Sequence, residues 1–200
     1  MSHAVGITQR SLAPTEFGER RYGLDRRWFS FLAGCGLVAV PLPNIAEVAV
    51  AGARALGLRG IVFSGGDDLA AYGGPACGRD ETERALLGWA TDAEVPVLGV
   101  CRGAQLLLDA FGVRLAPVDG HVATRHMIDG DTAPRMVNSY HRYAAHTVTA
   151  PLRITATCGD VVVAFTHRDA HVAGIMWHPE REDTVAAEDV LLFRTMFGGS

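Results

Sequence analysis

Gly99-Val100-Cys101-Arg102-Gly103 joins a predicted buried strand directly to a predicted helix. The apolar run Val95–Leu98 precedes this stretch and the run Ala104–Leu108 follows it, so Cys101 falls on a tight strand-to-helix turn. The order Gly-x-Cys-x-Gly is that of a nucleophile elbow, in which the flanking glycines leave space beside a strained residue. A thiol at a helix N-terminus is also favoured as the reactive thiolate by the helix dipole. Cys101 is therefore a candidate nucleophile, and the alternative is a small buried side chain with no chemistry.

Composition limits the remaining possibilities. Two hundred residues, 48% of them hydrophobic, predict a single domain over residues 1–200 with a substantial core. No apolar run is long enough to span a bilayer and no secretory leader is seen, so we expect a cytoplasmic protein. A net charge of −4 argues against nucleic acid or a membrane surface as partner. All 18 basic residues are arginine, which excludes lysine Schiff-base chemistry and a P-loop.

The cysteines indicate neither a disulfide framework nor a metal site. Cys35, Cys77, Cys101 and Cys158 include no Cys-x-x-Cys pair and no zinc-ligand spacing. His167 and His171 are four residues apart, but the segment between them reads as a turn rather than a helix. We therefore expect no metal and no cofactor.

Apolar runs alternate with helical segments through the first half of the chain, which predicts an α/β domain with a mainly parallel sheet. Trp28, Phe29 and Leu32 are expected on the buried face of the first helix. Asn44 is expected to cap the second helix, with Ile45, Val48, Ala49 and Leu56 as its apolar positions. The predicted strands are Ala4–Thr8, Leu37–Leu42, Gly60–Ser64 and Val95–Val100, and the predicted helices are Leu24–Ala33, 44–56, Arg79–Thr91 and the segment after Cys101.

Beyond Phe111 the pattern predicts a small antiparallel β region that returns to the main sheet, then a last helix over Ala186–Phe197. His121 and His126 flank a predicted loop, and His126 and His141 are candidates to line a pocket. The predicted β segments are Leu115–Val118, Thr147–Val148, Arg153–Thr157, Val161–Thr166 and Val172–Met176.

A cysteine nucleophile needs a base and a group that orients the base. Trp177-His178-Pro179-Glu180 follows a predicted strand, which places His178 at a strand end, where the site of an open α/β sheet is expected. Glu180 can hold the imidazole in one tautomer. The backbone N–H of Arg102 and a glycine N–H of Gly65 or Gly66 are candidates for the oxyanion hole.

Four segments together resemble the motifs of class I glutamine amidotransferase-like hydrolases, in particular their γ-glutamyl hydrolase branch. These segments are Phe63–Gly66, Gly99–Gln105, Val137–His141 and Met176–Glu180. The resemblance covers essentially the whole chain and implies a flavodoxin-like three-layer sandwich. It implies a triad of Cys101, His178 and Glu180, which forms a γ-glutamyl thioester that water then hydrolyses. It also implies that Gln105 and the segment Asn138, Ser139, Tyr140 and His141 hold the glutamyl group of a small-molecule substrate.

Within that branch, Gly6–Arg10, Glu19–Trp28, Tyr72–Gly74 and Arg79-Asp80 are most similar to the γ-glutamyl-CDP-amidate hydrolases. That similarity implies release of glutamate and cytidine diphosphoramidate, a precursor for capsule decoration. The arginines that follow the first strand suit a phosphorylated leaving group, and Arg10 is the candidate contact. The alternative is an ion-paired surface, since acidic residues are interspersed. These arginines are Arg10, Arg20, Arg21, Arg26 and Arg27.

Three other functions stay open from the sequence. The chain could hydrolyse γ-glutamyl-γ-aminobutyrate, or it could be a glutaminase subunit that supplies ammonia to a separate synthase. A thiol sensor or a small-molecule binding protein with the same elbow is the third, although such a protein does not need His178 and Glu180. The sequence is compatible with a homo-oligomer.

Overall fold

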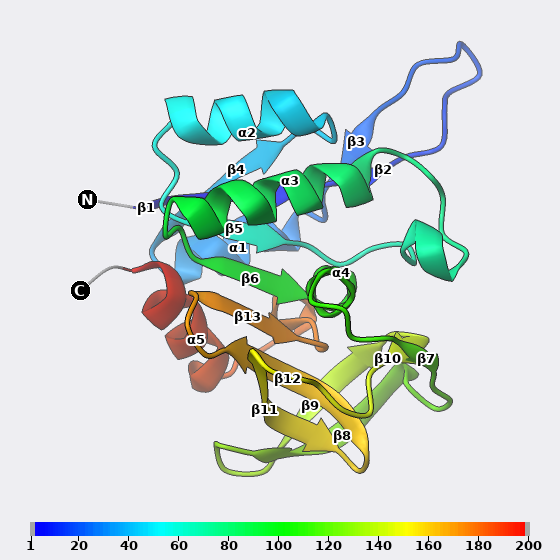
Figure 1. Ribbon diagram of the computed structural model, residues 1–200, viewed down its shortest axis with the longest axis vertical. Helices are drawn as coiled ribbons and strands as arrows, with labels where there is room; N and C mark the ends of the chain where they lie inside the picture. Colours follow the sequence, from blue (N-terminus) through cyan, green and yellow to red (C-terminus); the bar gives the residue numbers. More distant parts are fainter. Residues whose placement is uncertain (1–2, 199–200) are drawn as a thin grey trace.

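The computed structural model describes residues 3–198, which are built around one nine-stranded sheet. Its strand order is β4-β1-β5-β6-β13-β12-β11-β8-β9 (Figure 1). The strands are β1 His3–Thr8, β4 Leu37–Leu42, β5 Ile61–Phe63, β6 Val97–Val100, β8 Val122–Gly130, β9 Arg135–Tyr140, β11 Leu152–Cys158, β12 Val161–His167 and β13 Val172–Ile175. Two short pairs lie outside this sheet, β2 Arg10–Ser11 with β3 Tyr22–Gly23 and β7 Ala116–Pro117 with β10 Tyr143–Ala144.

The sheet has a parallel part and an antiparallel part that share β13. Strands β4, β1, β5, β6 and β13 run parallel, with Val100 opposite Ile175 at the ends of β6 and β13. Strands β12, β11, β8 and β9 continue the sheet with antiparallel pairing. The α/β architecture with a mainly parallel region and a smaller antiparallel region is confirmed. Because the parallel strands end at one edge, the loops after β1, β5, β6 and β13 meet there.

Helices cover both faces of the parallel part (Figure 1). Helix α2 packs beside α3, and α4 packs on β6 and β13. Helices α1 and α5 pack together through Phe31 and Phe193, whose ring centroids are 4.7 Å apart. The helices are α1 Arg27–Gly34, α2 Ala46–Ala55, α3 Arg79–Asp92, α4 Arg102–Ala110 and α5 Ala187–Phe197, with single 3₁₀ turns at Ala70–Tyr72 and Pro179–Arg181. None of these helices is long and apolar enough to cross a bilayer.

The expected helix faces are partly wrong. Phe29 is 44% exposed, and Phe31 is buried in its place. Val48 on α2 and Ile45 at its N-cap are about half exposed, whereas the small residues Ala49 and Ala53 are fully buried. Leu56 is 61% exposed.

Asn44 does not cap α2. Its amide donates instead to the backbone oxygen of Gln9 at 3.0 Å and to Ser11 Oγ at 3.1 Å. Ile45 occupies the N-cap position and makes no side-chain capping bond. Asn44 therefore secures the segment after β1 rather than the helix.

The largest error concerns the antiparallel region. The predicted loop between His121 and His126 is the first part of β8, which pairs with β9 as a hairpin. Most residues of β8 are exposed or half-buried, so its sequence lacks the apolar alternation that marks a strand. Thr147–Val148 is not a strand; the nearby pair is Tyr143–Ala144 with Ala116–Pro117.

Candidate active site

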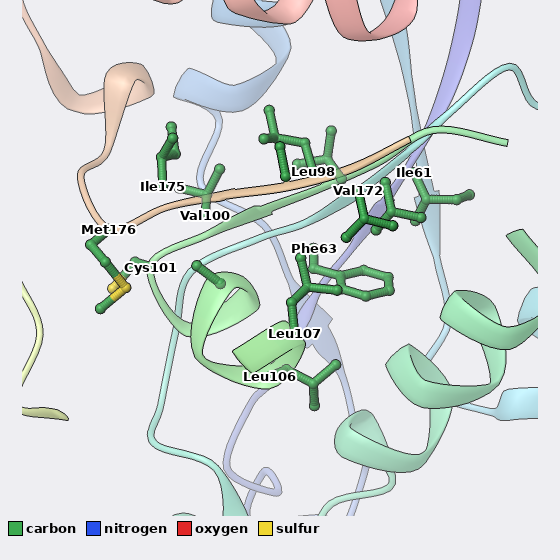
Figure 2. Close-up of a cluster of buried hydrophobic side chains, with 14 of the residues drawn as sticks. Ile61, Phe63, Leu98, Val100, Cys101, Leu106, Leu107, Val172, Ile175 and Met176 are labelled. Atoms are coloured by element: carbon green, nitrogen blue, oxygen red, sulfur yellow. The ribbon is translucent and has the colours of Figure 1, made fainter. Parts of the chain in front are cut away.

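Cys101 stands on a strained turn between β6 and α4. Its backbone has φ 52° and ψ −104°, a left-handed conformation that a residue with a side chain rarely adopts. The turn is held on both sides, because the Cys101 N–H donates to the Ile175 oxygen at 2.8 Å and the Gln105 N–H donates to the Cys101 oxygen at 2.9 Å. Figure 2 shows Cys101 where the chain turns from β6 into the following helix, at one end of a cluster of buried apolar side chains.

The two glycines of the elbow are required by space. A Cβ on Gly99 would lie 2.6 Å from the Ala104 nitrogen, and a Cβ on Gly103 would overlap the carbonyl of Phe63. The α4 backbone can therefore approach β5 and β6 only because both positions lack a side chain. Both glycines thus leave the space beside Cys101 that the Gly-x-Cys-x-Gly pattern predicts.

His178 lies just after β13, buried beside the elbow. Its Nδ1 lies 2.7 Å from Glu180 Oε1, and both side chains are 1% exposed. Burial alone would lower the pKa of His178, but the nearby Cys101 sulfur and then the Glu180 carboxylate outweigh it and raise the pKa to about 9. The structure thus brings together Cys101, His178 and Glu180, the three residues expected to form a triad.

The loop after β5 lies against the imidazole. A Cβ on Gly65 would overlap Cε1 of His178, so only glycine permits this approach. Gly66 has φ +154°, a conformation that side chains disfavour. Of the two predicted oxyanion-hole glycines, Gly65 therefore lies against His178 and Gly66 follows it, while the Arg102 backbone follows Cys101 at the start of α4.

The residues expected to hold the glutamyl group are mostly engaged with protein. Gln105 is buried and its Nε2 donates to the Tyr143 oxygen at 2.8 Å. Ser139 is buried and donates to the His121 oxygen at 2.8 Å. The side-chain amide of Asn138 is hydrogen-bonded to the backbone N–H and carbonyl of His178. These three side chains are hydrogen-bonded within the protein, and contact of Asn138 and Ser139 with a glutamyl group stays a prediction.

Tyr140 remains available to a ligand. It is 42% exposed, and its ring packs edge-on against His178 with 5.7 Å between centroids. The guanidinium of Arg181 also lies over this ring, 4.7 Å from the centroid. The sequence reasoning missed Arg181, although its position directly after Glu180 was a usable signal.

Two cavities adjoin the candidate residues. One of about 280 Å³ lies against His178 and is lined by Arg10, Leu12, Gly23, Leu24, Asp25, Trp28, Ser64, Gly65, His178, Glu180 and Arg181. The other, of about 470 Å³, adjoins the loop that follows β5 and contains Gly65 and Gly66, the glycine loop. It is lined by Gly66, Asp67, Asp68, Gly73, Gly74, Pro75, Val122, Tyr140 and Arg142. Arg142 and Asp67 were not expected from the sequence. Arg142 lies 4.0 Å from Asp68 of the same loop, a contact between segments that are far apart in the sequence.

The predicted arginine cluster is largely ion-paired. Arg10 pairs with Asp67 across the rim of the glycine loop, Arg21 pairs with Glu19, and Arg27 pairs with Asp25. The Arg27 hydrogen bonds hold the pKa of Asp25 at about 2. Among these arginines, Arg10 is the one that lines the cavity beside His178.

Three histidines from the hairpin region are grouped behind the site. The ring of His121 lies 4.2 Å from that of His126 and 4.8 Å from that of His141, measured between centroids. Burial, followed by the charge of His121, lowers the pKa of His141 to about 3. Over residues 3–198, no group of three or more histidine, cysteine or acidic side chains is arranged to hold a metal ion.

Comparison with known proteins identifies the family. The sequence profile of Glutamine amidotransferase class-I matches residues 32–196. The chain belongs to the class I glutamine amidotransferase family. γ-Glutamyl-CDP-amidate hydrolase of Campylobacter jejuni is 28% identical over 183 residues, covering 90% of this chain and 90% of that protein. A glutamine-hydrolyzing GMP synthase subunit of Methanocaldococcus jannaschii is 27% identical over 67% of this chain and 71% of its own length.

Solved structures of the family's fold are also similar. A glutamine amidotransferase from Thermotoga maritima superposes with a TM-score of 0.66 at 14% identity, covering 99% of this chain and 83% of its own. A protein from Thermoplasma acidophilum superposes with a TM-score of 0.75 at 17% identity, covering 99% and 94%. At these identities the likeness establishes the fold, which is the flavodoxin-like one expected.

Proposed function

We propose that this protein is a cysteine hydrolase that cleaves a γ-glutamyl amide through a γ-glutamyl thioester on Cys101. The observation that carries the proposal is the buried His178–Glu180 pair, 2.7 Å apart, beside a cysteine on a strained elbow. A protonated imidazole next to the sulfur is the arrangement of a thiolate–imidazolium pair. The glycine loop supplies backbone N–H groups next to it.

In the proposed mechanism, the Cys101 sulfur attacks the amide carbonyl and forms a tetrahedral oxyanion. Backbone N–H groups of Gly66 and Arg102 stabilise the negative oxygen. His178 gives its proton to the leaving nitrogen, the C–N bond breaks and the thioester remains. Water then gives a proton to His178 and adds to the thioester, which releases glutamate and restores the thiolate–imidazolium pair. Glu180 keeps the imidazole oriented during both the formation and the hydrolysis of the thioester.

The leaving group that we propose is cytidine diphosphoramidate, with γ-glutamyl-CDP-amidate as substrate. The C. jejuni relative, matched over nine-tenths of both chains, carries that name. Arg10 and Arg181 line the cavity against His178, the residue that would protonate the leaving nitrogen. Guanidinium groups there suit diphosphate oxygens.

A second candidate is a glutaminase subunit that feeds ammonia to a synthase, since GMP synthase subunits are among the relatives. A kinetic panel separates the two. Purified protein is assayed with glutamine, γ-glutamyl-γ-aminobutyrate and γ-glutamyl-CDP-amidate, with Cys101→Ala as the inactive control. We expect the highest kcat/KM for the CDP-amidate and no turnover by Cys101→Ala.

Other results of this panel point elsewhere. A preference for γ-glutamyl-γ-aminobutyrate would assign the small-amide activity. Glutamine turnover that is negligible alone and rises on adding a synthase would favour the glutaminase subunit. Turnover that survives in Cys101→Ala would reject the thioester mechanism.

A further inference from the structure

A buried ion pair lies directly beneath the glycine loop. Arg79, at the start of α3, is 2% exposed and its Nε lies 2.9 Å from Oε1 of Glu83, which is fully buried. Burial lowers the pKa of Arg79, and the adjacent Glu83 carboxylate counteracts this effect. A buried ion pair is costly to desolvate and adds little to stability compared with apolar packing. Its presence here calls for a role other than stability.

The guanidinium of Arg79 is bonded to the loop. Nη2 donates to the Ser64 carbonyl at 2.6 Å and to Ser64 Oγ at 3.0 Å, and Nη1 donates to the Gly65 carbonyl at 3.2 Å. Thr8 completes the support, since its hydroxyl accepts the Ser64 N–H at 3.1 Å and donates to Glu83 at 2.7 Å. Two successive carbonyls of the loop are therefore turned toward one cation.

From this geometry we propose that Arg79 is a positioning residue that holds the oxyanion hole in its working orientation. A trans peptide is planar, and its N–H points opposite to its carbonyl. With the Gly65 carbonyl held by Arg79, the Gly66 N–H of the same peptide points away from the buried network. That is the direction a donor needs if it is to serve a substrate carbonyl outside the network. The inference rests on the proposed function of Cys101.

Glu83 links this support to the other candidate donor. Its Oε2 accepts from Nη1 of Arg102, the residue directly after Cys101, and the other Arg102 nitrogen pairs with Asp80. Arg102 is 3% exposed, so its side chain is unavailable to substrate. One buried carboxylate thus contacts both the arginine that holds the glycine loop and the arginine that follows Cys101.

The discriminating experiment compares Arg79→Lys with Arg84→Lys. Lysine at 79 keeps the charge beside Glu83 but loses the fork that reaches both carbonyls. Arg84 lies on the same helix, is 44% exposed and pairs with Asp109, so it is a matched control. Losing an oxyanion donor costs about 10²–10³-fold in kcat, and we expect a fall of about 10-fold or more in Arg79→Lys with KM little changed. Arg84→Lys should match the wild type.

A labelling readout separates positioning from a general structural role. A diazoketone analogue of glutamine places its carbonyl in the oxyanion hole, whereas iodoacetamide alkylates a thiolate by simple displacement. Arg79→Lys should slow diazoketone labelling of Cys101 by about the same factor as kcat. Iodoacetamide labelling should stay within about twofold of the wild type, because the thiolate and His178 are unaltered.

Several outcomes would overturn the inference. Unchanged kcat and unchanged diazoketone labelling in folded Arg79→Lys would do so, as would equal losses with both reagents. If Arg79→Lys does not fold, Thr8→Val is used in its place. A selective loss of diazoketone labelling in Thr8→Val would support the inference, and unchanged labelling would contradict it. A wild type that the diazoketone does not label would overturn the proposed function and this inference with it, whereas a labelled wild type isolates the role of Arg79.

Discussion

Asn138 of β9 clamps the backbone of His178. Its Oδ1 accepts the His178 N–H at 2.8 Å, and its Nδ2 donates to the His178 carbonyl at 2.8 Å. Both residues are buried, and the same Nδ2 lies 2.8 Å from Glu182 Oε1. The hairpin, 40 residues from His178 in sequence, therefore holds the backbone of the candidate base at both its N–H and its carbonyl.

Replacing Asn138 should harm turnover through the position of His178. Asn138→Ala leaves both buried backbone groups without their partner, which costs about 1–3 kcal/mol of unfolding free energy. We expect kcat to fall by at least about tenfold, because a base must be within hydrogen-bonding reach of its proton. Thr82→Val, which removes the part-buried hydrogen bond of Thr82 to the Gly78 oxygen, is the control for stability. Equal stability loss with equal kcat loss in both variants would contradict this role.

Stability should depend on pH through His178. Its pKa is raised from 6.5 to about 9 in the folded protein, so its contribution is fully present below pH 6.5 and is lost as pH rises through 9. Urea unfolding from about pH 6 to about pH 9.5 should show this decline. Cys101→Ala should reduce this decline in stability more than Glu180→Gln does, since Cys101 is the larger cause of the raised pKa of His178. A decline of the same size in both variants and the wild type would assign it to another group.

The elbow should not accept a methyl group at Gly103. Gly103→Ala forces a Cβ into the carbonyl of Phe63, and we expect a loss of about 1–3 kcal/mol or more, with loss of activity. Gly88, on the exposed side of α3, has open space for a Cβ. Gly88→Ala should therefore gain about 0.5–1 kcal/mol from helix propensity. Thermal unfolding of the two variants checks the contrast, and comparable stability would show that the elbow backbone yields.

Arg10 should discriminate among leaving groups. Arg10→Ala is expected to raise KM for γ-glutamyl-CDP-amidate by about tenfold, because it removes one charge-assisted hydrogen bond to phosphate. The KM for γ-glutamyl-γ-aminobutyrate should be unchanged, since this substrate has no phosphate. Asp67→Asn removes the carboxylate that now pairs with Arg10, so it should leave KM for the CDP-amidate equal or lower. Equal effects of Arg10→Ala on both substrates would remove the phosphate argument.

The local features of the site were predictable from sequence. Backbone patterns a few residues long place Cys101 between two glycines at the end of one strand. Similar patterns place His178 and Glu180, two residues apart, after the end of another strand. The positions of Gly65 and Gly66 followed in the same way. The direction in which Asn138 and Ser139 point was not predictable, because either residue can bond to a ligand or to a backbone.

The sequence by itself determined where the parallel strands end and which residues stand at those ends, since apolar runs and glycine turns are local signals. Only the tertiary structure decided that Asn138 clamps His178 and that Arg79 lies under the glycine loop. It also decided that a mostly exposed segment pairs as β8. The two side-chain contacts join residues 40 and 15 positions apart, and the strand depends on its pairing with β9. The periodicity of one segment does not indicate which other segment it will contact.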